Sequence, residues 1–216
     1  MYEQLIDTGL AHLGLALDSV QRVQLDRYIA ELERFNPTYK LVGSSGEELV
    51  IRHIFDSLAA VKTIEAITRG QKRVRLADLG SGAGLPGIPL AIALPHSSVA
   101  LVERMQRRVG FLRSAIVASA LTERVRILDV DLSQVRERFD VVTFRALRPL
   151  VEILDRVAPL VDEGAMICAY KGQREQVLAE LAAVEEGCKS RWESELVAIE
   201  VPMLASERTL CLLRKI

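Results

Sequence analysis

Cysteine is scarce in this sequence, and the three present, Cys168, Cys188 and Cys211, lie far apart with no Cys-x-x-Cys spacing. An odd number of isolated cysteines argues against a disulfide framework or a zinc site, so we expect buried free thiols and no bound metal. Long apolar runs are also lacking: none could span a bilayer, and no segment has the basic, apolar and small-residue order of a signal peptide. We expect a soluble cytoplasmic protein that does not contact a membrane.

An excess of one charge is absent as well, since 28 basic and 29 acidic residues give a formal net charge of −1. The whole chain therefore exerts no general attraction on a polyanion, and any role with nucleic acid must depend on a local basic patch. A length of 216 residues is enough for one sizeable core, or for one domain with a small extension. Nothing in the sequence indicates an obligate interface, so we expect a monomer.

Residues 1–70 have the pattern of a helical extension. Apolar residues recur at threes and fours over residues 20–35, which is the spacing of an amphipathic helix. The Asn-Pro pair that ends at Pro37 is expected to stop this helix, because proline disfavours the helical conformation in the residue before it. A short connector follows, after which Ser44 or Ser45 could cap a second helix.

Three polar residues of the second helix, Arg52, His53 and Asp56, lie three or four positions apart and so share one face. The ordinary explanation for His53 is a hydrogen bond to Asp56, with Asp56 also paired to Arg52. We expect this structural role for His53, and the sequence leaves open whether the residue also contacts a substrate.

From residue 74 onward, strand-like and helix-like segments alternate. Apolar, strand-like runs occupy 74–79, 98–103, 125–129, 139–144, 164–169 and 208–214, with a weaker candidate at 193–201. Helix-like stretches lie at 86–94, 105–120, 149–159 and 173–186. The alternation predicts an α/β fold with a Rossmann-like, mostly parallel seven-stranded sheet and helices on both faces. The predicted organisation is one domain over residues 71–216, preceded by the helical extension.

A cluster of four glycines directly follows the first predicted strand. Gly82-x-Gly84-x-x-Gly87 fits the dinucleotide-binding pattern of nicotinamide-dependent oxidoreductases, but this pattern alone is weakly specific. Asp78 lies at the strand end two residues before Gly80, where its carboxylate would face the ligand. Such a group would repel a pyrophosphate and would hold a cationic amine. S-adenosylmethionine carries that amine, so the sequence favours a methyltransferase.

Two further acids follow the next strands. Glu103, about 20 residues on, is placed to accept both ribose hydroxyls of a cofactor, and Asp131 after the third strand is placed for the adenine amine. Each acid also has a simpler explanation, since Glu103 could open a charged helix and Asp131 could cap a helix or form a turn. Acids at three successive strand ends nevertheless make a consistent cofactor site at one edge of the sheet.

Seven segments carry a resemblance to a known family, and they span nearly the whole chain: 35–41, 51–57, 78–89, 107–113, 145–146, 170–173 and 207–208. The Gly-Leu-Pro-Gly-Ile-Pro run and the Arg-His-x-x-Asp-Ser motif are the specific ones. In this order the segments resemble the glucose-inhibited division protein B family, the type G methyltransferases of the small ribosomal subunit. The resemblance implies a class I methyltransferase that uses S-adenosylmethionine to methylate N7 of a guanine in the 530 loop of bacterial 16S ribosomal RNA.

The resemblance also implies which residues bind the cofactor, in addition to Asp78 and Gly82 of the glycine turn: Gly80, Leu85, Glu103, Val130, Asp131 and Arg145, with backbone groups of Arg104 and Met105. At the end of the fourth strand, Arg145 is expected to be a substrate-side cation that bridges a phosphate or donates to guanine O6. Lys171, at the next strand end, is a second candidate for contact with RNA or cofactor. A surface charge is the ordinary alternative for both.

Methylation at guanine N7 agrees with what the sequence lacks. N7 presents an in-plane lone pair, so the reaction needs positioning rather than deprotonation. The fourth strand is not followed by Asn-Pro-Pro-Tyr or Pro-Cys, the elements of exocyclic-amine and carbon-5 methylation. The implied partner is 16S ribosomal RNA in the small subunit or its precursor, and a solvated or phosphate-binding arginine face is expected over residues 104–113. The alternatives are a methyltransferase for another RNA, a small molecule or a protein, and a non-catalytic nucleotide-binding module.

Overall fold

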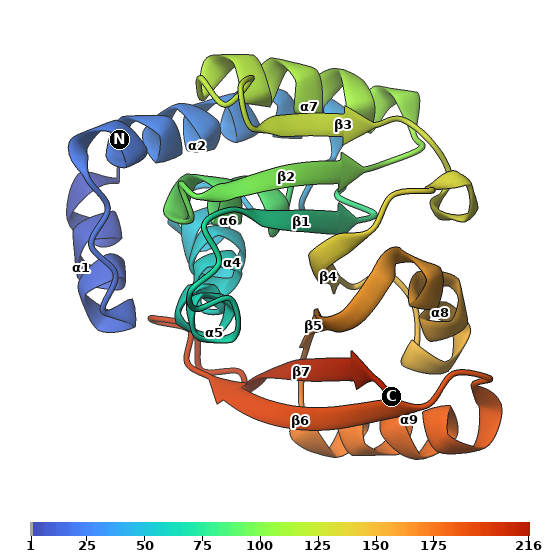
Figure 1. Ribbon diagram of the computed structural model, residues 1–216. Coiled ribbons are helices and arrows are strands. Elements are labelled where there is room, and N and C mark those ends of the chain that lie inside the picture. Colours follow the sequence, from blue (N-terminus) through green and yellow to red (C-terminus); the bar gives the residue numbers. More distant parts are fainter. Residues whose placement is uncertain (1) are drawn as a thin grey trace.

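A seven-stranded sheet forms the centre of the protein, seen in a computed structural model that describes residues 2–216 (Figure 1). The strands lie in the order β3 (Val125–Leu128), β2 (Ser97–Val102), β1 (Val74–Leu79), β4 (Phe139–Arg145), β5 (Val161–Lys171), β7 (Arg208–Lys215) and β6 (Trp192–Ile199). Strands β1 to β5 pair in parallel, whereas β7 is antiparallel to both β5 and β6. The carboxyl ends of the parallel strands therefore meet at one edge, where the chain order reverses between β1 and β4.

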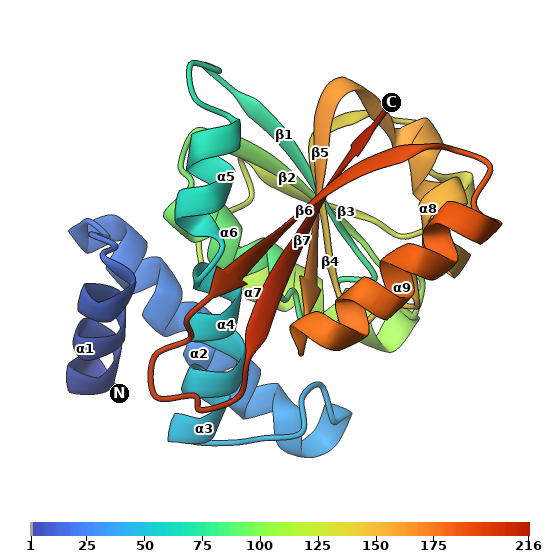
Figure 2. The same cartoon turned by 90° about the horizontal axis from the view of Figure 1, so that it is seen from below.

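Helices cover both faces of this sheet (Figure 2). On one face, α6 (Gly87–Ala93) and α7 (Gln106–Ala118) pack with the N-terminal helices over a buried apolar cluster. On the other face, α8 (Leu150–Val157) and α9 (Arg174–Gly187) cover a second cluster. The architecture confirms the predicted α/β fold with a mostly parallel seven-stranded sheet.

The N-terminal segment consists of α1 (Glu3–Leu13), α2 (Ser19–Tyr39), α3 (Glu47–Leu49), a π-helical turn η1 (Val50–Phe55), α4 (Asp56–Leu58) and α5 (Val61–Ile67). It contacts the glycine-rich turn and helix α6 through buried polar groups as well as through apolar packing. The Tyr28 hydroxyl donates to the Ala83 carbonyl at 2.7 Å, and the Gln21 amide donates to the Ile92 carbonyl at 2.8 Å. No helix within residues 2–216 has both the length and the hydropathy to cross a membrane.

Two details of this segment differ from the sequence-based expectation. Helix α2 does not stop before Pro37 but continues to Tyr39, because a proline in the last turn removes only one helical hydrogen bond. The Asn36 side chain then holds the connector by accepting from the Val42 N–H and donating to the Ser44 carbonyl, both at 2.9 Å. Neither serine caps α3: the residue before the helix is Gly46, whose φ of 62° and ψ of −144° suit glycine.

Candidate active site

A glycine-rich turn connects β1 to α6 at the carboxyl edge of the sheet. Gly80 has a φ of +67°, a left-handed conformation that other residues rarely adopt. A Cβ atom at this position would lie 2.5 Å from the Leu147 Cδ1 atom of the β4–α8 connection. Glycine is therefore required here both by the backbone conformation and by the close approach of a second loop.

Asp78 lies fully buried beneath this turn. Its Oδ2 accepts a hydrogen bond from the Gly87 N–H at the start of α6, at 3.1 Å, and its Oδ1 has no partner within the described residues. Burial raises the pKa of the Asp78 carboxyl to about 7, against the opposing effect of the Gly87 hydrogen bond. The sequence predicts that this carboxylate faces the ligand; in the structure Asp78 is buried and is not among the residues that line the pocket at this edge of the sheet.

Glu103 joins the end of β2 to the glycine turn, and its side chain is only 4% exposed. Its Oε1 accepts from the N–H groups of Arg104 and Met105, both at 2.9 Å, and its Oε2 accepts from the Gly82 N–H at 3.0 Å. Arg108 lies 3.6 Å from the same carboxylate. Glu103 is thus a buried, fully oriented anion and not a surface charge at the start of a helix.

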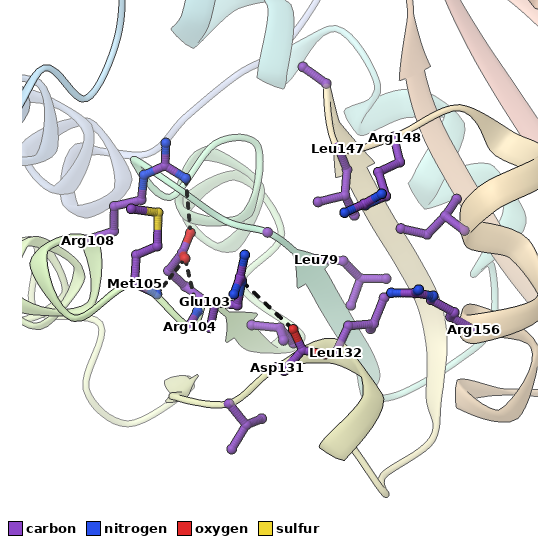
Figure 3. Close-up of a pocket in the computed structure, with 15 residues that line it drawn as sticks. Leu79, Glu103, Arg104, Met105, Arg108, Asp131, Leu132, Leu147, Arg148 and Arg156 are labelled. Carbon is purple, nitrogen blue, oxygen red and sulfur yellow. Dashed lines mark hydrogen bonds and ion pairs between the residues drawn. The ribbon is translucent and has the colours of Figure 1, made fainter.

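A pocket of about 310 Å³, here called the first pocket, opens over the ends of β1 and β2. Figure 3 shows Glu103, Met105 and Arg108 on one side, and Leu147 and Arg148 across from them. Six of the predicted cofactor residues line it: Gly80, Glu103, Arg104, Met105, Val130 and Asp131. The others, Asp78, Gly82, Leu85 and Arg145, lie outside its lining.

Asp131 forms the turn cap that its sequence position suggested, and it also lines the first pocket. It caps the short helical turn Leu132–Gln134, since its Oδ1 accepts from the N–H and the hydroxyl of Ser133, at 3.1 and 2.8 Å. These hydrogen bonds, the backbone one first, hold the pKa of the Asp131 carboxyl below its usual value. The same side chain lines the first pocket, 3.8 Å from Arg104. Capping therefore fixes the carboxylate at the pocket wall.

A second pocket, of about 440 Å³, lies beside the first, and Ala146 lines both. Arg145 and Lys171, predicted at the ends of neighbouring strands, are brought together here. The wall is completed by residues from the N-terminal segment and from the β5 and β7 ends: Arg52, His53, Asp56, Tyr170, Gly172 and Arg208. Lys171 is not free within this pocket, because its Nζ donates to Glu180 at 2.7 Å.

The predicted His53–Asp56–Arg52 arrangement is wrong. The Asp56 carboxylate forms ion pairs with Arg145 and Arg208, at 2.8 and 3.1 Å. Arg52 pairs instead with Glu48, at 2.7 Å. His53 Nδ1 is buried without a partner within residues 2–216. Burial, and then the nearby Arg145 cation, lower the pKa of His53 to about 4, so its imidazole is neutral near pH 7. The arginines that displace the expected contacts come from strand ends far away in the sequence.

Two of the three arginines of α7 are paired with acids at the same edge of the sheet. Arg108 lies 3.6 Å from Glu103, and Arg113 lies 3.6 Å from Asp129. Arg107 packs its guanidinium over the Tyr39 ring, 4.8 Å from the ring centroid. The helix face is therefore largely compensated in charge.

Sequence reasoning missed the wall that α8 and its preceding loop supply. Leu147, Arg148, Ile153 and Arg156 line the first pocket. Figure 3 shows Leu147, Arg148 and Arg156 across from Glu103. They belong to a segment that reads as an ordinary amphipathic helix, and their role depends on the crossing of β4 beside β1. No local pattern distinguishes them.

The fold is similar to solved structures of methyltransferases. A Methanococcus maripaludis protein named as an S-adenosyl-L-methionine-dependent methyltransferase matches with a TM-score of 0.59 at 14% identity, covering 87% of this chain and 91% of that one. The tRNA (m1A58) methyltransferase of Aquifex aeolicus matches with a TM-score of 0.52 at 18% identity, over 73% and 69% of the two chains. Such identities show the fold alone. With the glycine turn and the strand-end acids, this fold defines a class I S-adenosylmethionine-dependent methyltransferase.

The family follows from sequence comparison. The GidB family model, described as rRNA small subunit methyltransferase G, matches residues 21–210. A Laribacter hongkongensis protein named Ribosomal RNA small subunit methyltransferase G is 35% identical over 208 residues, which are 95% of this chain and 94% of the relative. A Chromobacterium violaceum protein of the same name is 35% identical over 204 residues, 94% of this chain and 92% of the relative. The chain belongs to the GidB family.

S-adenosylmethionine is the cofactor of this class, and the residues present suit it. The unpartnered Asp78 Oδ1 is an acceptor that a cationic amine can satisfy. The Glu103 carboxylate is held rigidly by backbone N–H groups, and its Oε2, which accepts from only one of them, retains room for a further donor. Gly80 leaves the floor of the pocket without a side chain.

Proposed function

We propose that this protein transfers the methyl group of S-adenosylmethionine to N7 of a guanine in the 530 loop of 16S ribosomal RNA. The observation that carries the proposal is the second pocket, which is lined by cations and shares the Ala146 wall with the first pocket. A donor pocket and an anion-attracting pocket in direct contact suit transfer from a small cofactor to a nucleotide. The names of the relatives agree with a small-subunit ribosomal RNA as substrate.

The proposed reaction does not require an ionisable side chain to transfer a proton. When bound, the cofactor would supply a methyl group on a sulfonium; a bond from that carbon to N7 would form as its bond to sulfur breaks, which leaves a neutral thioether and a positive charge on the guanine base. N7 carries no proton, so no general base is required. The protein therefore contributes mainly by holding the two reactants in line, at roughly 3–3.5 Å.

On the cofactor side, we assign the ribose hydroxyls to Glu103 and the adenine amine to Asp131. Both carboxylates line the first pocket and are held by hydrogen bonds to backbone N–H groups. Val130 supplies an apolar wall, and backbone groups of Arg104 and Met105 lie beside the ribose acid.

Asp78 is assigned to the ammonium group of the cofactor, through its unpartnered Oδ1. Gly80 and Gly82 let the backbone of the turn approach the cofactor, since both adopt positive φ. Leu85, buried in the same turn, would support the methionine chain from behind.

On the substrate side, Arg145 is assigned to the target nucleotide. Only its Nη1 is used by described protein acceptors, so the remaining N–H groups of its guanidinium can donate to a phosphate or to guanine O6. Lys171, neutralised by Glu180, would add a weaker contact. We further propose that the protein acts in the cytoplasm as a monomer, on the small ribosomal subunit or its precursor.

The decisive experiment supplies tritiated S-adenosylmethionine to small subunits, and to protein-free 16S RNA, from a strain that lacks the enzyme. Label at N7 of a guanine in the 530 loop is expected. The matched control is RNA in which that guanine is replaced by adenine, which should remain unlabelled. Label at another base or atom would reject the specific assignment. Absence of label on RNA, with transfer to a small molecule or a protein, would support the alternative methyltransferases instead.

A further inference from the structure

One carboxylate in the second pocket binds two arginines at once. The Asp56 Oδ2 accepts from Arg145 Nη1 at 2.8 Å, and its Oδ1 accepts from Arg208 Nε at 3.1 Å. The Asp56 side chain is only 4% exposed, whereas those of Arg145 and Arg208 are 19% and 26% exposed. The acid thus lies deeper in the wall of the second pocket than the two arginines that it binds.

The three groups come from different parts of the fold. Asp56 begins α4 in the N-terminal segment, Arg145 ends β4, and Arg208 begins β7. Strand β5 separates β4 from β7, and Tyr170 of β5 is paired with Arg145 on one side and with Leu210 on the other. Both guanidinium groups therefore reach the same edge of the sheet, where two cations would repel each other without the shared carboxylate.

The position of Asp56 is itself fixed. The Tyr170 hydroxyl donates to the carbonyl of Ser57, the next residue in the chain, at 2.8 Å. The Ser57 hydroxyl donates to the His53 carbonyl at 2.6 Å. Tyr170 and Ser57 are both buried, so these bonds anchor α4 to the middle of the sheet. A carboxylate held in this way can orient its partners rather than follow them.

The arginines keep donors for a ligand. Within residues 2–216, the hydrogen bonds to protein use Nη1 of Arg145 and use Nε and Nη1 of Arg208. Nε and Nη2 of Arg145 and Nη2 of Arg208 remain for an acceptor in the pocket. Among the described lining residues, four cations face one carboxylate. After Glu48 and Glu180 neutralise Arg52 and Lys171, the pocket still has a surplus positive charge.

We propose that Asp56 is a positioning residue that holds Arg145 and Arg208 as a fixed pair for the phosphate and base of the target nucleotide. This inference rests on the proposed function, because it assigns the pair to the same acceptor. Asp56 itself touches neither reactant. Its carboxylate cancels the repulsion between the two guanidinium groups and sets the direction of their remaining N–H groups, so that the acceptor is placed against the donor pocket.

The test is a double-mutant cycle of Asp56→Asn and Arg208→Gln, read by methyl transfer to 16S RNA and by calorimetric titration with S-adenosylmethionine. Asp56→Asn should reduce kcat/KM for RNA about 100-fold, the effect expected when a reactant is misplaced by about 1 Å. Cofactor affinity should be unchanged. Since Asp56 acts through the arginines, the double variant should lose no more kcat/KM than the less active of the two single variants.

Asp140→Asn is the matched control. Asp140 also pairs with an arginine, Arg75 at 2.7 Å, but it lies near the opposite end of β4. This variant should methylate RNA at the wild-type rate. If Asp56→Asn is fully active, or if its effect multiplies with that of Arg208→Gln, the positioning role is rejected. Loss of cofactor binding in proportion to loss of activity would also reject it, because a general structural defect would produce that result.

Two further measurements keep the outcome decisive. If Asp56→Asn does not fold, Asp56→Glu preserves the charge and displaces both guanidinium groups by one methylene. It should keep cofactor affinity and lower kcat/KM for RNA, and full activity would overturn the proposal. Methyl transfer by the wild-type protein to the same RNA is measured before the variants are compared. Its absence rejects the proposed function, whereas wild-type activity with an unaffected Asp56→Asn rejects only the positioning role.

Discussion

Glu103 accepts a hydrogen bond at 3.0 Å from the backbone N–H of Gly82, which lies 21 positions earlier in the chain. The contact ties the end of β2 to the turn that follows β1. It leaves a carboxylate oriented by backbone groups at the wall of the first pocket. The contact thereby joins the end of β2 and the turn after β1 at one edge of the sheet.

Replacing Glu103 by Gln should weaken S-adenosylmethionine binding. An amide keeps the size of the side chain but directs its NH₂ group at backbone N–H donors. We expect the Kd to rise roughly tenfold or more, because a hydrogen bond to a charged group contributes about 1.5–3 kcal/mol. Calorimetric titration with S-adenosylmethionine measures this Kd. Glu137→Gln, which removes an exposed partner of Arg126, is the control and should bind normally. An unchanged Kd for Glu103→Gln would contradict the assignment.

Asp78 should make the stability of the cofactor-free protein depend on pH. Its pKa is raised from 3.8 to about 7 by burial, so between these values the folded state binds more protons than the unfolded state. The free energy of unfolding is therefore highest below the lower value, falls as the pH rises towards 7, and levels off above it. Asp78→Asn should remove this component. Urea denaturation of both proteins at several pH values measures the difference, and parallel curves would refute the prediction.

Two glycines should respond oppositely to alanine. Gly80→Ala places a methyl group 2.5 Å from Leu147 Cδ1 at a φ of +67°, so we expect destabilisation by about 1–2 kcal/mol or more. Gly110 lies within α7, and a Cβ there meets nothing within 4 Å. Gly110→Ala should stabilise the protein by roughly 0.5–1 kcal/mol through helix propensity. Urea unfolding measures both, and equal effects would mean that the Gly80 contact is not restrictive.

Arg145→Ala should reduce methyl transfer to RNA more than it disturbs the fold. Asp56 would keep one partner, Arg208, so the buried carboxylate remains paired. Turnover should fall roughly tenfold or more, as expected for one charge-assisted hydrogen bond to the substrate. Circular dichroism checks the secondary structure. Arg126→Ala, which removes an exposed cation of β3, serves as the comparison. Unchanged turnover in Arg145→Ala would reject its place on the substrate side.

Local patterns in the sequence were sufficient for most of the fold. The run at 74–79 coincides with β1, and the expected strand at 98–103 differs from β2 by one residue at each end. The helix stop expected at Pro37 was wrong, because a single lost hydrogen bond in a last turn is tolerated and the Asn36 side chain supports the residues that follow. The periodicity of apolar residues indicates which side of a helix is buried. Where a helix ends depends instead on individual contacts, such as those of the Asn36 side chain.

The sequence predicted the location of a site residue only where that residue directly follows a strand, because the strand end alone then places it at the edge of the sheet. Glu103 and Asp131 are of this kind, and both line the first pocket. The contacts of Asp56 were not predictable in this way, since its partners lie 89 and 152 positions away. Nearby His53 and Arg52 are the obvious candidates in the sequence, and nothing local indicates that two strand ends will bring stronger partners to the same carboxylate.

The position of β7 in the sheet determines the order in which the two pockets become complete during synthesis of the chain. Among residues 2–216, none that lines the first pocket lies beyond Arg156, whereas the second pocket includes Arg208 at the start of the last strand. Chains are synthesised from the N-terminus, and folding of the early part proceeds while the later part is still being made. A nascent chain therefore possesses every described side chain of the first pocket about fifty residues before the arginine that completes the second. Under the proposed function, we expect capture of the target nucleotide to be delayed until β7 has entered the sheet between β5 and β6.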